Sequence, residues 1–327
     1  MMKNGKLIAI SGVSTLIIGL AACGDKPEQQ AGTKTEQTGA PTTSGDAQTT
    51  LAEARKGVAA GVTTQINQEE PAETPPADVM KLVRYPSNGQ EISGYLSVKP
   101  DDGKKHPAII WISGGDLSIG DFWSPQPAEN DQSAAAFREK GMVVFYPSMR
   151  GLNGNPGNIE GFYGELDDIV AATEWLKQQP NVDPDRIYLG GHSTGGTMVL
   201  LASEYADKWA GVFSFGPVSD PTVYGDVAPV PIDSADKEGV RLRAPVNWLA
   251  SIKKPTFVIE GDGQGNIDEL NSLRRASKNP QVSFIAAGGC DHFSVLRSAS
   301  VIIADAIIKN DVASLATNKQ LLALCKA

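Results

Sequence analysis

Residues 191 to 195 read Gly-His-Ser-Thr-Gly and place one hydroxyl between two glycines, a spacing typical of a serine nucleophile. They follow the apolar run RIYLG and precede an apolar segment of helical spacing, so Ser193 is predicted at a sharp turn between a strand and a helix. Side chains two positions before and after such a serine would collide, which explains the glycine at both places. The peptide N–H of Thr194 then faces a developing oxyanion.

Glycine-rich turns also bind phosphate, so two other interpretations must be compared. A Walker-type loop needs a lysine after its last glycine, but Gly196 is followed by Thr197 and Met198, and no lysine occurs from 192 to 204. A dinucleotide fingerprint would follow the first strand of its sheet, whereas this cluster follows a late one. The spacing therefore favours a nucleophile over a phosphate cradle.

A serine nucleophile needs a base, and the chain has three histidines. His106 stands beside two lysines ahead of a predicted strand, as a solvated surface residue would. His192 lies inside the turn and is expected to point away from the serine. His292 follows the last predicted strand in GGCDHFS, which places it at the carboxyl edge of the sheet. By elimination and position, His292 is the predicted general base.

Short apolar segments alternate with helical ones along the chain, which predicts a mostly parallel sheet covered by helices on both faces. Ligands of such sheets bind beyond the carboxyl ends of the strands, where Ser193 and His292 are expected. The predicted strands are 92–98, 106–113, 142–147, 186–190, 210–215, 255–261 and 281–287, and the predicted helices are 133–141, 164–179, 194–205, 267–278 and 294–310.

Two segments carry a resemblance to a known family. VDPDRIYLGGHSTGG (182–196) and YPSMRGLNGNPGNIEGFYGELDDIVAATEWL (146–176) resemble the catalytic domain of the prolyl oligopeptidase family within the α/β-hydrolases, and the likeness extends from about 80 to 310. The resemblance implies an α/β-hydrolase fold and a serine hydrolase that uses a Ser-His-Asp triad on a small peptide or ester. It favours a peptidase, although carboxylesterases and dienelactone hydrolases share the bare domain.

The acid of the triad is where this chain departs from the family pattern. The family places it three residues after the glycine that ends the penultimate strand, and here that position is Gln264. Asp268 is the favoured acid, with Asp262 and Asp220 as alternatives. The glutamine also supports a different hypothesis, in which the chain is a non-catalytic lipoprotein that uses the fold as a binding scaffold.

A second oxyanion donor is expected from the loop after strand 106–113, which reads Ser-Gly-Gly-Asp. It is similar to the histidine-glycine-glycine loop of esterases, with serine in place of histidine. Glycines let the backbone approach a substrate closely, so the N–H of Gly115 is predicted to act together with that of Thr194.

Composition narrows the possible partners. The chain has 327 residues, a net charge of −9 and a pI near 5.0, and it contains no run of Lys and Arg, so nucleic acid is not an expected partner. Neither a His-Glu-x-x-His nor a Cys-x-x-Cys motif occurs, and no cofactor or catalytic metal is expected.

The N-terminus has the features of a targeting segment. Residues 1–23 carry two lysines, a short apolar stretch and Leu-Ala-Ala-Cys, in the order of a bacterial lipoprotein signal with its lipobox. This resemblance implies acylation of Cys23, a membrane anchor, and a place in the cell envelope on the periplasmic face. Lipoproteins without an aspartate directly after the acylated cysteine tend to go on to the outer membrane, so Gly24 favours that membrane.

The domain boundaries follow from composition. Residues 24–76 contain no aromatic side chain and are rich in Gln, Thr, Gly, Glu, Ala and Pro, so they are predicted to be a flexible tether, with a short helical patch near 51–62. Residues 77–327 are predicted to be the α/β-hydrolase domain. Cys290 and Cys325 in that domain could form a disulfide, worth about 4 kcal/mol by chain entropy, or stay separate buried thiols.

Overall fold

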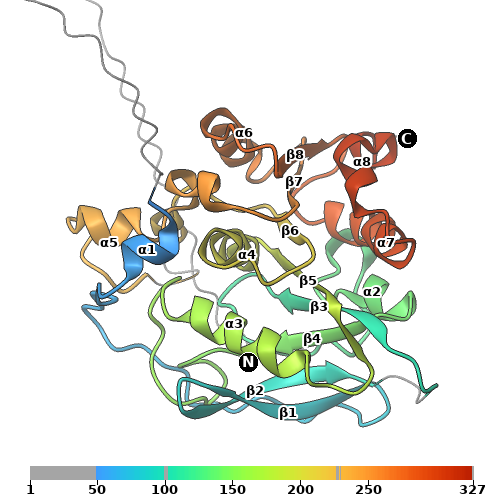
Figure 1. Ribbon diagram of the computed structural model, residues 1–327, viewed down its shortest axis with the longest axis horizontal. Coiled ribbons are helices and arrows are strands. Elements are labelled where there is room, and N and C mark those ends of the chain that lie inside the picture. The colour runs from blue at the N-terminus through green and yellow to red at the C-terminus, as the bar shows by residue number, and fades with distance from the viewer. Residues whose placement is uncertain (1–48, 99–101, 226–227, 229, 326–327) are drawn as a thin grey trace, which may run out of the picture. The chain divides into compact units, whose positions relative to one another are not determined.

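The computed structural model is built on an eight-stranded sheet in the order β1-β2-β4-β3-β5-β6-β7-β8, and it describes residues 49–98, 102–225, 228 and 230–325 (Figure 1). β1 and β2 form an antiparallel hairpin, β2 pairs antiparallel with β4, and every later pairing is parallel. The strands are β1 (Met80–Ser87), β2 (Gln90–Ser97), β3 (His106–Ile112), β4 (Val143–Pro147), β5 (Val182–His192), β6 (Val212–Phe215), β7 (Thr256–Gly261) and β8 (Val282–Ala287).

Helices cover both faces of the sheet, as expected for parallel strands joined by crossovers. α3 and α4 lie on one face with α1, and α2, α7 and α8 lie on the other (Figure 1). The helices are α1 (Leu51–Arg55), α2 (Ala135–Glu139), α3 (Glu165–Leu176), α4 (Thr194–Tyr205), α5 (Lys237–Arg241), α6 (Ile267–Ala276), α7 (Val295–Ile308) and α8 (Lys319–Leu322).

The central strands are buried on both faces because their side chains alternate between two cores. In β3, Ala108, Ile110 and Ile112 belong to the core beneath α3 and α4, whereas Ile109 and Trp111 belong to the core beneath α2 and α7. This alternation explains the continuous apolar run in the sequence, since neither face of such a strand meets water.

The α/β-hydrolase architecture is confirmed, and the predicted strands and helices are present with shifted ends. Two differences have local causes. The helix expected from 133 begins at Ala135 because Ala134 has a left-handed backbone, with φ +49°. β1 was not among the predicted strands. It is joined to β2 by Asn88 and Gly89, both at positive φ, which suits a tight hairpin turn.

The predicted tether boundary at residue 76 is wrong for the part of the chain that the structure describes. The described residues from 49 onward belong to one compact unit, and the segment 49–76 contacts the hydrolase core. Leu51 of α1 is fully buried in the core beneath α4, and Ile66 packs against the same core. Arg55 donates hydrogen bonds to the carbonyls of Leu242 and Phe162, at 2.7 and 2.8 Å from Nη2. The segment has few apolar residues, but Leu51 and Ile66 among them pack on the hydrolase core.

The predicted tether over 24–48 and the leader with Cys23 lie outside the described residues. Within the described ranges, no helix combines the length and the apolar character that a membrane span requires. At the other end of the chain, Cys290 and Cys325 form a disulfide, which decides between the two sequence alternatives. The bridge ties the loop before His292 to the residues that follow α8, and the N–H of Cys325 also donates to the carbonyl of Gly288 at 3.0 Å.

Candidate active site

Ser193 occupies the turn between β5 and α4, with φ +57° and ψ −114°, a conformation that a side-chain-bearing residue adopts only under constraint. The constraint is visible in its neighbours. A Cβ on Gly191 would lie 2.5 Å from the carbonyl oxygen of Gly195, and one on Gly195 would lie 2.2 Å from that of Ile112. The Ser193 N–H donates to the carbonyl of Phe215 in β6 at 2.8 Å. The sequence thus builds the elbow that its glycines predict.

His292 lies in the loop between β8 and α7, close to this elbow. A Cβ on Gly216 would lie 2.4 Å from His292 Cε1, and Gly216 directly follows the residue that accepts the Ser193 N–H. The His292 ring also lies 4.5 Å, centroid to centroid, from the ring of His192, the residue before the serine. The fold therefore brings the predicted nucleophile and base to the same edge of the sheet, although they are far apart in sequence.

The carboxylate that contacts His292 belongs to Glu260. His292 Nδ1 lies 2.9 Å from Glu260 Oε2, and Glu260 Oε1 accepts the N–H of Gly261 at 2.8 Å. The Glu260 side chain is fully buried in β7 and that of His292 is 13% exposed. A buried carboxylate needs such partners, and a proton on Nδ1 leaves Nε2 with its lone pair, as a general base requires.

This contact corrects the expectation that Asp268 orients the base. Asp268 is exposed in the first turn of α6 and makes no side-chain hydrogen bond or ion pair with any residue that the structure describes. The two alternatives have other partners. Asp262 accepts the N–H of Gly289, and Asp220 accepts that of Thr222 at the start of a 3-10 helix. The carboxylate that contacts His292 therefore lies inside β7, before its last glycine, rather than in the loop that follows.

One sequence signal could have identified Glu260. It is the only charged residue in the buried run TFVIEG, and burial of an unpaired carboxylate is costly. A charged residue at the carboxyl end of such a strand therefore implies a partner at that edge of the sheet. His292, whose imidazole N–H can donate to a carboxylate, lies in the loop that follows the next strand, β8.

Gly115 and Thr194, the predicted oxyanion donors, are in direct contact. The hydroxyl of Thr194 donates to the Gly115 carbonyl at 2.8 Å, which holds the β3 loop against the first turn of α4. Gly114 lies closer still to the nucleophile, because a Cβ on it would be 3.3 Å from Ser193 Cβ. Neither the Thr194 N–H nor the Gly115 N–H has an acceptor among the residues described. The positive end of the α4 dipole also favours an anion here.

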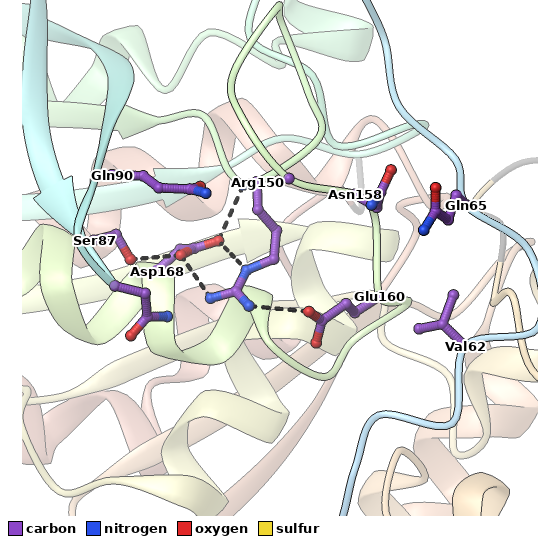
Figure 2. Close-up of a pocket in the computed structure, with 10 residues that line it drawn as sticks. Val62, Gln65, Ser87, Gln90, Arg150, Asn158, Glu160 and Asp168 are labelled. Carbon is purple, nitrogen blue, oxygen red and sulfur yellow. Dashed lines mark hydrogen bonds and ion pairs between the residues drawn. The ribbon is translucent and has the colours of Figure 1, made fainter.

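A separate polar pocket of about 360 Å³ lies beside Arg150, and its lining includes neither Ser193 nor His292 (Figure 2). Arg150 forms a two-pronged ion pair with the buried Asp168, with Nε–Oδ2 and Nη2–Oδ1 distances of 2.9 Å. Its Nη1 pairs with Glu160 at 3.1 Å, and Ser87 donates to Asp168 at 2.6 Å. The positive charge of Arg150 is thus paired with two carboxylates inside the protein. The network links β1, α3 and the loop between β4 and α3.

No group of three or more His, Cys, Asp or Glu side chains could hold a metal ion among the described residues. The site brings together a hydroxyl on a constrained backbone, an imidazole held by a buried carboxylate, and two peptide N–H groups without an acceptor among the described residues. Such a set suits nucleophilic attack on a carbonyl.

Comparison with known proteins agrees with this geometry. A model of the prolyl oligopeptidase family matches residues 129–278, which include Ser193 and Glu260. The uncharacterized peptidase YtmA of Bacillus subtilis is 31% identical over 216 residues, which cover 61% of this chain and 78% of that protein. The chain belongs to the prolyl oligopeptidase family. It is a serine hydrolase of that family's α/β-hydrolase class.

Solved structures show the same fold at lower identity. The acylaminoacyl peptidase of Pyrococcus horikoshii aligns with a TM-score of 0.55 and 18% identity, over 70% of this chain and 41% of that one. An esterase of Pyrobaculum calidifontis aligns with a TM-score of 0.53 and 16% identity, over 72% of this chain and 87% of that one. The fold of this family member is therefore shared by peptidases and esterases.

Proposed function

We propose that this prolyl oligopeptidase family member cleaves peptide or small ester bonds through a Ser193–His292–Glu260 triad. The observation that carries the proposal is the contact between His292 Nδ1 and the buried Glu260 carboxylate, beside the strained elbow of Ser193. Glu260 fixes the imidazole tautomer, so Nε2 is the atom that accepts the serine proton.

The reaction follows from these positions. Ser193 Oγ attacks the substrate carbonyl carbon while its proton passes to His292 Nε2, and the oxyanion accepts hydrogen bonds from the N–H groups of Thr194 and Gly115. Collapse of this intermediate breaks the bond to the leaving amine or alcohol, which takes the proton from His292. Water then attacks the acyl ester on Ser193 by the same steps, which releases the acid and restores the enzyme.

A peptide is the favoured substrate class because the matched family is a peptidase family and YtmA is named a peptidase. The esterase neighbour keeps a carboxylester as the second candidate, because its fold covers a similar share of this chain. The binding-scaffold hypothesis rested on Gln264 at the family's acid position. Glu260 supplies a carboxylate to His292 from another position and removes that support.

The proposal is tested by covalent labelling with a fluorophosphonate, which reacts with activated serines. We expect labelling of Ser193 in the wild type and none in Ser193→Ala, together with loss of nitrophenyl acetate turnover in that variant. Full turnover in folded Ser193→Ala would refute the proposal.

We also propose that the protein is anchored in the cell envelope by lipid on Cys23. Support comes from the sequence alone, in which basic residues, an apolar stretch and Leu-Ala-Ala-Cys occur in the order of a lipoprotein signal. Two or more acyl chains give stable membrane attachment. The wild type is expected in the detergent phase of a Triton X-114 extract and Cys23→Ser in the aqueous phase. Equal partitioning of the two would contradict the anchor.

A further inference from the structure

His192, inside the nucleophile turn, has a hydrogen-bond partner at each ring nitrogen although its side chain is buried. Nε2 lies 3.0 Å from the carbonyl oxygen of His292, and Nδ1 lies 3.0 Å from Gln132 Oε1. The residue is 1% exposed. The histidine directly before the nucleophile is thus bonded to the main chain of the proposed base, which goes beyond the packing role expected from sequence.

The protonation state of His192 follows from its surroundings. Burial, with a smaller contribution from the neighbouring His292, lowers the pKa of His192 to about 3, so its ring is neutral at neutral pH. The His292 carbonyl can only accept, so Nε2 must carry the single ring proton and donate it. Nδ1 is then an acceptor, which requires the Gln132 amide to be turned so that its nitrogen, now directed at Asn130 Oδ1, faces Nδ1, and the exposed Asn130 amide to turn with it.

We propose that His192 is a positioning residue, which holds the His292 backbone at a fixed distance from the serine through the Nε2–H bond. The inference rests on the proposed function, in which His292 is the base. Its physical basis is direct, because residue 192 ends β5 and its neighbour is the nucleophile, so one residue sets the position of both reacting groups. Glu260 holds the tip of the imidazole, and His192 holds the main chain from which it projects.

Other contacts limit the His292 loop but do not replace this bond. A Cβ on Gly265 would lie 2.5 Å from His292 Cβ, so the loop is packed on that side, and the disulfide of Cys290 lies two residues before the base. Without the His192 donor, the partly buried His292 carbonyl would lose its partner, and the loop would shift to find another. A shift of about 1 Å at a reacting group costs roughly a hundredfold in rate.

The test compares two amide substitutions that differ only in reach. In His192→Gln the side-chain nitrogen lies as many bonds from Cβ as Nε2 does, whereas in His192→Asn it is one bond shorter and cannot reach the His292 carbonyl. His106→Gln is the control, because His106 pairs with Asp102 at the protein surface. Each variant is measured for kcat and KM on nitrophenyl acetate, for its rate of fluorophosphonate labelling and for its melting temperature.

We expect His192→Gln to retain kcat within about threefold and His192→Asn to lose roughly ten- to a hundredfold, with KM unchanged and labelling slowed in parallel. His106→Gln should match the wild type. Equal activity of the Gln and Asn variants, a loss carried by KM, or an Asn variant that does not fold would each overturn the positioning role. Absence of labelling in the wild type would instead refute the proposed function, so the two failures are distinguishable.

Discussion

Glu260 has two hydrogen-bonding partners for its buried carboxylate, the imidazole of His292 and the N–H of Gly261. Its side chain is fully buried in β7, so these two partners take the place of bulk solvent around the carboxylate. The same argument applies to His192, whose two ring nitrogens are both bonded inside the protein. At the scale of single residues, Glu260 and His192 show that a polar side chain of the site can be buried when it has hydrogen-bond partners.

His192 gives a prediction for stability against pH. Its pKa is about 3 in the folded protein, mainly because of burial, and about 6.5 in an unfolded chain. The unfolded state therefore binds one more proton between these values, and the free energy of unfolding falls as pH drops from about 6.5 toward 3. The slope from this group is at most about 1.4 kcal/mol per pH unit.

Urea unfolding at several pH values measures the effect. The stability difference between wild type and His192→Gln should shrink as pH falls through this window, because the variant lacks the titrating group and the other groups cancel. A difference that stays constant from pH 7 to pH 4 would show that His192 is not held neutral by burial.

The nucleophile elbow was predictable from five residues because the backbone around Gly191 and Gly195 leaves no room for a side chain at either position. The β1–β2 hairpin had a comparable signal in Asn88-Gly89, between residues that pair along the whole length of the hairpin. Glu260 was missed because the family pattern places the acid in the following loop, and Asp268, Asp262 and Asp220 all follow strands rather than lie within one. Whether a strand residue's side chain reaches a neighbouring loop depends on tertiary packing.

The docked N-terminal segment gives a prediction at the scale of elements. Leu51→Ala removes a fully buried side chain between α1 and α4, and it should lower the free energy of unfolding by about 2–4 kcal/mol. Lys56→Ala, at an exposed position directly after α1, should change it by less than about 0.5 kcal/mol. Equal stability of the two variants in urea titrations would mean that α1 is not part of the hydrolase core.

For the whole molecule, alternation of short apolar strands with helices was enough to predict the fold class, because a sheet buried on both faces requires it. The domain boundary was less accessible to composition. Leu51 and Arg55 dock a segment whose average composition resembles a tether, and the docking is seen only in their tertiary contacts, namely the core around Leu51 and the carbonyls bonded to Arg55. The sequence also left undecided whether Cys290 and Cys325 form a disulfide, since spacing along the chain does not give the distance between two thiols.

The most direct test of the account compares Glu260→Gln with Asp268→Asn. Each substitution replaces a carboxylate with an amide of nearly the same size and shape. Glu260→Gln should lower kcat for nitrophenyl acetate by about 10³- to 10⁴-fold, because the imidazole loses the partner that fixes its tautomer. Asp268→Asn, on the exposed face of α6, should stay within twofold of the wild type. The reverse ranking, with Asp268 essential and Glu260 dispensable, would contradict the proposed triad.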